Sequence, residues 1–216
     1  MSTPFRPRNH LDENVWRARA FHTDASALAD IFSDKQIDLD DWATAIARSE
    51  ATGFPVKHGG AAWTPEMRIL SALFSVLRPK VAVEVGIARG ESLRAEREFH
   101  VPEVHVAYDV NPSFVGNAPK GVMAGVHDGT GPIALPAPFD LAFLDDGHSG
   151  GWTRRWLDTL NDASGPDSVI VVHDMRVEST GGDDRMCVVD FLRAHPEWAG
   201  YELRTPCGMA FLRRTT

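Results

Sequence analysis

The stretch Val-Ala-Val-Glu-Val-Gly-Ile-Ala-Arg-Gly, residues 81–90, decides the fold of this chain. Its first half predicts a buried strand, and its two glycines predict a turn that opens into a helix. Glu84 is an acid within an apolar run, which is costly unless the carboxyl group has a partner. Gly86 and Gly90 leave the backbone open to a ligand, and a helix start favours a carboxylate or phosphate there. The same pattern also fits a plain strand-to-helix turn in any α/β domain.

Composition narrows the class of protein. The 216 residues are 43% hydrophobic, which suits one globular domain with a sizeable core. A net charge of -8 without a long basic run argues against a nucleic-acid partner. The absence of a long apolar run and of a secretory signal predicts a cytoplasmic protein with no membrane partner. Cys187 and Cys207 fit no metal-binding spacing, so we expect reduced thiols with structural roles.

Two regions are expected along the chain. Residues 1–60 hold scattered large apolar side chains and two short helical patterns, and they predict a helical N-terminal cap. Exposed apolar residues on this cap could serve a homo-oligomer, or they could pack on the core. Residues 61–216 then form the main domain. It opens with Thr64-Pro65-Glu66, a strong helix start in which the negative charge of the acid interacts favourably with the positive end of the helix dipole.

Strands and helices alternate through the main domain. The predicted strands are apolar throughout, which indicates a sheet covered by helices on both faces. The end of the chain predicts an antiparallel hairpin at 201–204 and 209–212. The fold class is therefore α/β, with a seven-stranded, mostly parallel sheet and a C-terminal hairpin. The other predicted strands are 81–85, 104–108, 122–126, 140–144 and 169–172, and the helices after the first strand are 91–99, 152–160 and 187–194.

Chemically active side chains follow the predicted strands at their carboxyl ends. In sheets of this kind, ligands bind beyond those ends. Five strand ends that each supply a glycine, an acid or a histidine are more than surface solvation explains, so we expect a shared site. The residues concerned are Gly86, Asp109, His127, Asp128, Asp145, Asp146, His148, His173 and Asp174.

Over residues 62–213 these features resemble the class I S-adenosylmethionine-dependent methyltransferases, which have a Rossmann-like fold. Val83-Glu84-Val85-Gly86-Ile87-Ala88-Arg89-Gly90 is similar to the first motif of that family. The resemblance implies S-adenosylmethionine as the cofactor. It also implies cofactor contacts from Glu84, Gly86, Gly90, Asp109, His127, Asp128 and Asp145, with Asp109 on the ribose and His127-Asp128 near the adenine.

A narrower resemblance is to the branch that methylates hydroxyl groups of natural products, including macrolide sugars. It is carried by Phe143-Leu144-Asp145-Asp146-Gly147-His148 and by Val171-Val172-His173-Asp174. The resemblance implies that Asp145, His173 and Asp174 bind a divalent cation, Mg²⁺ or Mn²⁺, and that His148 is the general base, with Asp145 beside it in the catalytic site. It also implies a small-molecule acceptor and a place in secondary metabolism, such as antibiotic biosynthesis.

Two departures from the family pattern bear on these implications. Ala88 stands where many members have the middle glycine. The stretch between Asp109 and Asp145 is short, and residues 111–120 carry two prolines and a glycine. We therefore expect the helix between the second and third strands to be reduced to a loop, which would leave the adenine side of the pocket more open.

The chemistry fits the implied reaction. The cofactor carries its own leaving group, so the protein must orient the donor and activate the acceptor. A divalent cation and a base would lower the barrier for an aliphatic hydroxyl, although His173 favours softer metals than Mg²⁺. His148 could instead cap a helix, and Asp145 could be a solvated loop residue.

Other functions stay open. One is a metal-independent methyltransferase acting on a phenol, carboxylate or amine. The others are a nicotinamide-dependent (NAD) oxidoreductase and a non-catalytic binding subunit.

Overall fold

The structure, a computed structural model, describes residues 63–145, 150–175, 183–203, 205 and 207–215. The described helices are α4 (Trp63–Leu77), α5 (Glu91–Glu96), α6 (Gly150–Ala163) and α7 (Asp183–Ala194), with a short 3₁₀ helix η2 (Val115–Asn117). The strands are β1 (Val81–Val85), β2 (Val104–Asp109), β3 (Met123–Val126), β4 (Phe139–Leu144), β5 (Ser164–Val172), β6 (Trp198–Leu203) and β7 (Met209–Arg214).

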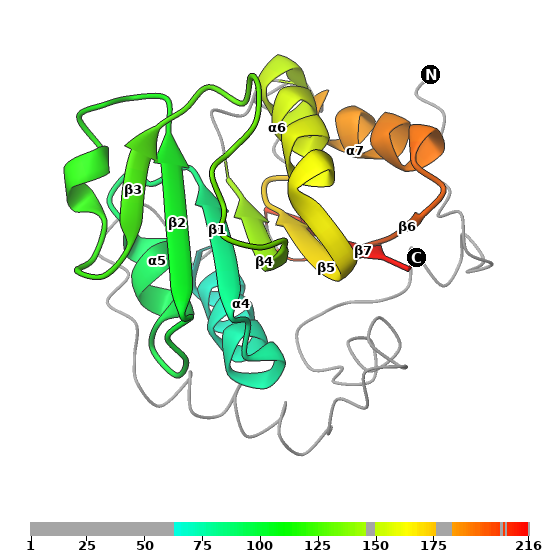
Figure 1. The fold of residues 1–216 in the computed structure, drawn as a ribbon. Coiled ribbons are helices and arrows are strands. Elements are labelled where there is room, and N and C mark those ends of the chain that lie inside the picture. The colour runs from blue at the N-terminus through cyan, green and yellow to red at the C-terminus, as the bar shows by residue number, and fades with distance from the viewer. Residues whose placement is uncertain (1–62, 146–149, 176–182, 204, 206, 216) are drawn as a thin grey trace.

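The seven strands form one sheet in the order β3-β2-β1-β4-β5-β7-β6 (Figure 1). Strands β1 to β5 are parallel to one another, and β7 pairs antiparallel with both β5 and β6. The predicted fold class is confirmed. The chain runs outward from β1 to β3 and then returns to β4 on the other side of β1, so the topological switch point lies between β1 and β4.

Helices cover both faces of the sheet (Figure 1). Alternate residues of β1 point to opposite faces, as the pleat requires. Val83 packs in a cluster with Trp156 of α6 and Phe191 of α7, whereas Ala82 packs in a second cluster with Phe74 of α4. All five residues of β1 are buried, which explains why its sequence is an unbroken apolar run apart from Glu84.

Several elements differ in extent from the sequence prediction. Helix α7 begins at Asp183 rather than at residue 187, and β6 spans Trp198–Leu203 rather than 201–204. Helix α5 ends at Glu96 rather than at residue 99. Strand β5 begins at Ser164, directly after α6, rather than at Val169. The first five residues of β5 carry no large aliphatic or aromatic side chain, Pro166 and Asp167 are exposed, and the register with β4 shifts there. Hydrophobic patterning cannot detect a strand end of that kind.

The connection from β2 to β3 contains no α-helix, as the short stretch predicts. Residues 110–122, all described, hold only the 3₁₀ helix η2. Edge strand β3 is correspondingly open, with Met123 55% and Val126 57% exposed. In the described part of the chain, no helix combines the length and apolar character needed to span a membrane. The predicted cap, residues 1–60, and the site residues Asp146 and His148 lie outside the described residues.

Candidate functional site at the carboxyl edge of the sheet

Three neighbouring strand ends meet beside the switch point. The backbone N–H of Asp145 donates to the carbonyl of Val85 at 2.9 Å, and the N–H of His173 donates to the carbonyl of Leu144 at 2.9 Å. The ladder hydrogen bonds therefore continue one step beyond the strands. They place Asp145 next to the glycine turn and His173 next to Asp145.

Asp145, His173 and Asp174 form a compact group of ionisable side chains at this edge. His173 Nδ1 lies 3.3 Å from Oδ1 of Asp145 and 3.1 Å from Oδ1 of Asp174. Burial opposes protonation of the imidazole, but the two carboxylates outweigh it and raise the pKa of His173 to about 10. Asp174 has a left-handed backbone with φ 57°, a conformation that aspartate adopts more readily than most residues other than glycine. The chain therefore turns sharply directly after His173.

One ligand atom from each of these three residues lies within 4.8 Å of the other two. Two carboxylate oxygens and one imidazole nitrogen suit a divalent transition metal such as Mn²⁺, and they suit Mg²⁺ less well because of the nitrogen. The donor set therefore fits the cation that the family resemblance implies.

The side chain of Asp109 is hydrogen-bonded to the backbone of the glycine turn after β1. Its Oδ2 accepts hydrogen bonds from the N–H groups of Ile87 (2.8 Å) and Ala88 (3.1 Å). Its Oδ1 accepts one from Asn111 at 2.8 Å, and the residue is 7% exposed. The sequence predicted a ribose contact for Asp109, which stays a prediction. The structure adds a second role, because this carboxylate holds the shape of the turn.

Gly90 is required for two reasons that concern the protein itself. Its φ is 68°, and a Cβ there would lie 2.6 Å from the backbone oxygen of Asn117. The Asn117 side chain in turn donates to the carbonyl of Ala88, which has a φ of 41°. Ala88 therefore replaces a glycine at a left-handed position and is held there by η2. Gly86 also has a positive φ, 95°, and is partly exposed beside the exposed residues Ala88 and Arg89, so a ligand can reach the outer side of the turn.

The side chain of Glu84, in β1, is buried inside the protein and does not reach the exposed surface of the turn. It is fully buried, and its Oε1 accepts a hydrogen bond from Ser92 at 2.7 Å. Burial raises the pKa of Glu84 well above its usual value, and the neighbouring carboxyl of Glu96 adds to this effect. The partner that an acid in an apolar run requires is thus Ser92, at the start of α5. A cofactor contact from Glu84 stays a prediction.

His127 and Asp128 lie after β3, on the far side of β2. The His127 ring packs against Tyr108, at 5.3 Å between centroids, and against Trp156, at 5.1 Å. Its Nδ1 accepts a hydrogen bond from the N–H of Gly129 at 3.0 Å. Asp128 accepts from the backbone and hydroxyl of Thr130, which lowers its pKa. Both residues are partly exposed, and their predicted adenine contacts are untested.

Two residues that the sequence did not place in a site approach this edge from distant segments. Glu66 of α4 and Cys207, in the turn between β6 and β7, each offer a ligand atom within 4.8 Å of one on His173. Glu66 matched a helix-dipole role, and Cys207 matched no metal spacing. No local pattern could have joined two residues that lie 141 positions apart.

Comparison with known proteins identifies the fold. No family model matches the chain, and no curated protein sequence matches it. Among solved structures, an O-methyltransferase from Bacillus cereus in complex with SAH aligns with a TM-score of 0.58 at 14% identity, over 88% of this chain and 97% of that one. The O-methyltransferase TomG from Streptomyces achromogenes, in complex with SAM, aligns at 0.59 and 16% identity, over 88% and 96%.

An N-methyltransferase also shares the fold. NodS from Bradyrhizobium japonicum, in complex with S-adenosylhomocysteine, aligns with a TM-score of 0.57 at 13% identity, over 82% of this chain and 100% of that one. This chain therefore has the fold of the class I S-adenosylmethionine-dependent methyltransferases, as its first motif predicts.

Proposed function

We propose that this protein is a methyltransferase that uses S-adenosylmethionine to methylate a hydroxyl group of a small molecule, with help from a divalent cation. The observation that carries the proposal is the position of Asp145. Its backbone is bonded to Val85, directly before the glycine turn, and its carboxylate lies 3.3 Å from His173. A candidate donor site and a candidate acceptor-activating site are therefore neighbours on one edge of the sheet.

The residues divide the chemistry as follows. The exposed side of the turn at Gly86 would receive the methionine part of the cofactor, and Asp109 would hold the turn in place beneath it. Asp145, His173 and Asp174 would hold the cation, which lowers the pKa of a bound hydroxyl when it is present. His148 remains our proposed base, because it follows Asp145 by three residues. These groups would orient the acceptor oxygen in line with the departing sulfur.

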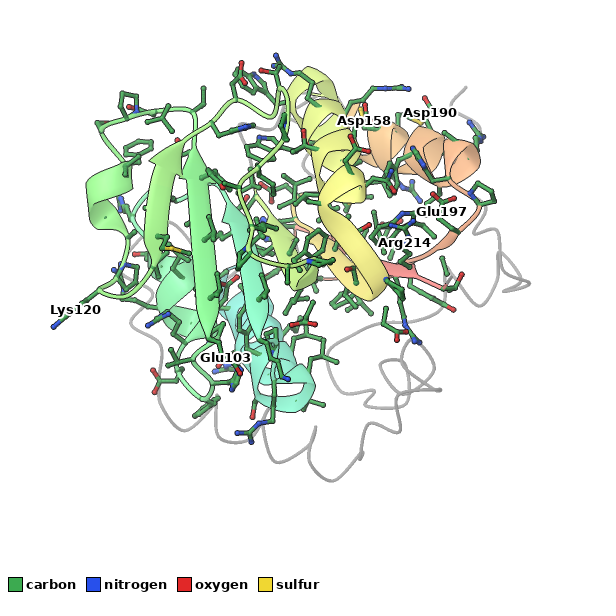
Figure 2. All side chains as sticks on the ribbon, in the orientation of Figure 1. Glu103, Lys120, Asp158, Asp190, Glu197 and Arg214 are labelled. Atoms are coloured by element: carbon green, nitrogen blue, oxygen red, sulfur yellow. The ribbon has the colours of Figure 1, made fainter. Side chains whose placement is uncertain are left out.

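The decisive experiment separates the cofactor from the metal. Calorimetric titration with S-adenosylhomocysteine should show binding to the full chain, with or without a chelator. Titration with Mn²⁺ should show one site that Asp145→Asn weakens. The matched control is Asp158→Asn, because Asp158 is an exposed acid on α6 (Figure 2). Absence of S-adenosylhomocysteine binding would refute methyl transfer, whereas unchanged Mn²⁺ binding in Asp145→Asn would remove only the metal assignment.

Turnover then tests the reaction class. Methyl transfer from S-adenosylmethionine to small hydroxyl compounds should stop in chelator and return with Mn²⁺. Activity that persists in chelator would favour the metal-independent alternative, with a more acidic acceptor such as a phenol. Cofactor binding without transfer to any hydroxyl, phenol, carboxylate or amine acceptor would instead support a binding subunit.

A further inference from the structure

A second group of candidate ligands also contains His173, and its members come from three elements that are far apart in sequence. Glu66 belongs to the first turn of α4, His173 follows β5, and Cys207 lies in the β6–β7 turn. One ligand atom from each lies within 4.8 Å of the other two. Neither Glu66 nor Cys207 belongs to the group of Asp145, His173 and Asp174.

The burial of the Glu66 carboxylate requires an explanation. Its side chain is fully buried, and its Oε1 accepts a hydrogen bond from the backbone N–H of Cys207 at 3.1 Å. Its Oε2 is also buried and has no hydrogen-bond partner among the residues that the structure describes. A buried carboxylate oxygen without a partner is costly, and native proteins normally satisfy such an atom with a donor or a cation.

The donor types define the cation. One oxygen, one nitrogen and one sulfur form a set that Mg²⁺ and Ca²⁺ disfavour, because those ions prefer oxygen ligands. Zn²⁺ accepts all three at bond lengths of about 2.0–2.3 Å, usually in a tetrahedral arrangement. We propose that Glu66, His173 and Cys207 form a binding site for Zn²⁺ or a similarly soft divalent cation. It shares His173 with the carboxylate-rich site beside it, and its other two ligands are different.

The geometry requires only a modest adjustment. Tetrahedral bonds of about 2.0–2.3 Å place ligand atoms roughly 3.3–3.8 Å apart, and the three atoms here already lie within 4.8 Å. Three protein ligands leave the fourth position open to water or to a neighbouring carboxylate. Bound in this way, the cation would join α4, the end of β5 and the terminal hairpin. The site does not depend on methyl transfer.

Binding exchanges two protons for the cation. Burial raises the pKa of the Cys207 thiol to about 12, and the nearby carboxylates of Glu66 and Asp174 add to this effect. Because the pKa of His173 is raised to about 10, its imidazole is also protonated at neutral pH when no metal is bound. When the Zn–S and Zn–N bonds form, one S–H bond and one N–H bond break and both protons pass to solvent, with no change of oxidation state.

The test uses Co²⁺ as a spectroscopic substitute for Zn²⁺ on the full chain. A thiolate ligand gives a sulfur-to-cobalt charge-transfer band in the near ultraviolet. The whole chain contains two cysteines, so each can be tested by itself. We expect the band in the unmodified protein and in Cys187→Ser, its displacement by Zn²⁺ but not by Mg²⁺, and its loss in Cys207→Ser.

A second variant keeps the proposal falsifiable if Cys207→Ser folds poorly. Glu66→Gln should keep the band but lower the affinity for Zn²⁺ by roughly 10–100-fold or more, since even groups that only support metal ligands contribute that much. Zn²⁺ should also raise the melting temperature of the unmodified protein and of Cys187→Ser more than that of either site variant. No band in the unmodified protein, a band that requires Cys187, or equal Zn²⁺ affinity in Glu66→Gln would overturn the proposal. The Co²⁺ band and S-adenosylhomocysteine binding are measured separately, so a failure of one does not imply a failure of the other.

Discussion

Replacing Asp109 with alanine should destabilise the protein even when no cofactor is present. The Asp109 carboxylate accepts three backbone N–H groups, and its bond to Ile87 is buried while those to Ala88 and Asn111 are partly buried. Taking about 1.5 kcal/mol for the buried charged bond and about half of that for each of the others, we expect a loss of about 3 kcal/mol. Asp109→Asn keeps one acceptor oxygen and should lose roughly half as much.

The assay is thermal unfolding of the cofactor-free protein, followed by circular dichroism. For a domain of this size, about 3 kcal/mol corresponds to a fall of roughly 6–12 °C in melting temperature. The matched control is Asp128→Ala, because Asp128 also follows a strand but bonds only to the nearby Thr130 among the described contacts. We expect little change in that variant.

The result would distinguish two roles for the same carboxylate. A residue that only contacts the cofactor would change S-adenosylhomocysteine affinity and leave the cofactor-free melting temperature alone. If Asp109→Ala melts within about 2 °C of the unmodified protein, which is less than about 1 kcal/mol, our reasoning about the turn is refuted. The glycine turn would then hold its shape without Asp109.

Two further predictions concern the core. Burial and then Arg97 lower the pKa of His105 to about 3, below the unfolded value of about 6.5; stability should therefore fall as pH drops from about 6.5 toward 3, by about 2 kcal/mol at pH 5. Urea midpoints should show a shallower fall in His105→Gln, and identical pH dependence would contradict this. Gly200→Ala should cost about 1–3 kcal/mol, because the new Cβ would lie 2.3 Å from Leu192 Cδ1. Gly151→Ala, at an open position of α6, should instead gain up to about 1 kcal/mol, and equal melting temperatures for the two variants would count against both.

Much of the fold could be predicted from local sequence because its signals are local. A buried parallel strand must be apolar on both faces, so β1 and β4 stand out as short apolar runs. Each run ends where a polar residue or glycine begins, which also locates the carboxyl edge and its candidate ligands. The short stretch after Asp109 likewise predicted that no full helix would follow β2. What stayed out of reach was the polar first half of β5, because it carries no periodic pattern.

Tertiary structure alone decided how the polar residues are partnered. Glu84 requires a partner by its position in an apolar run, but only the packing of α5 on β1 shows that Ser92 supplies it. The contact between Glu66 and Cys207 depends on how the first turn of α4 meets the terminal hairpin, across 141 positions of sequence. Spacing rules detect ligands within one loop or helix, and they cannot detect ligands that only the packing of separate elements brings together.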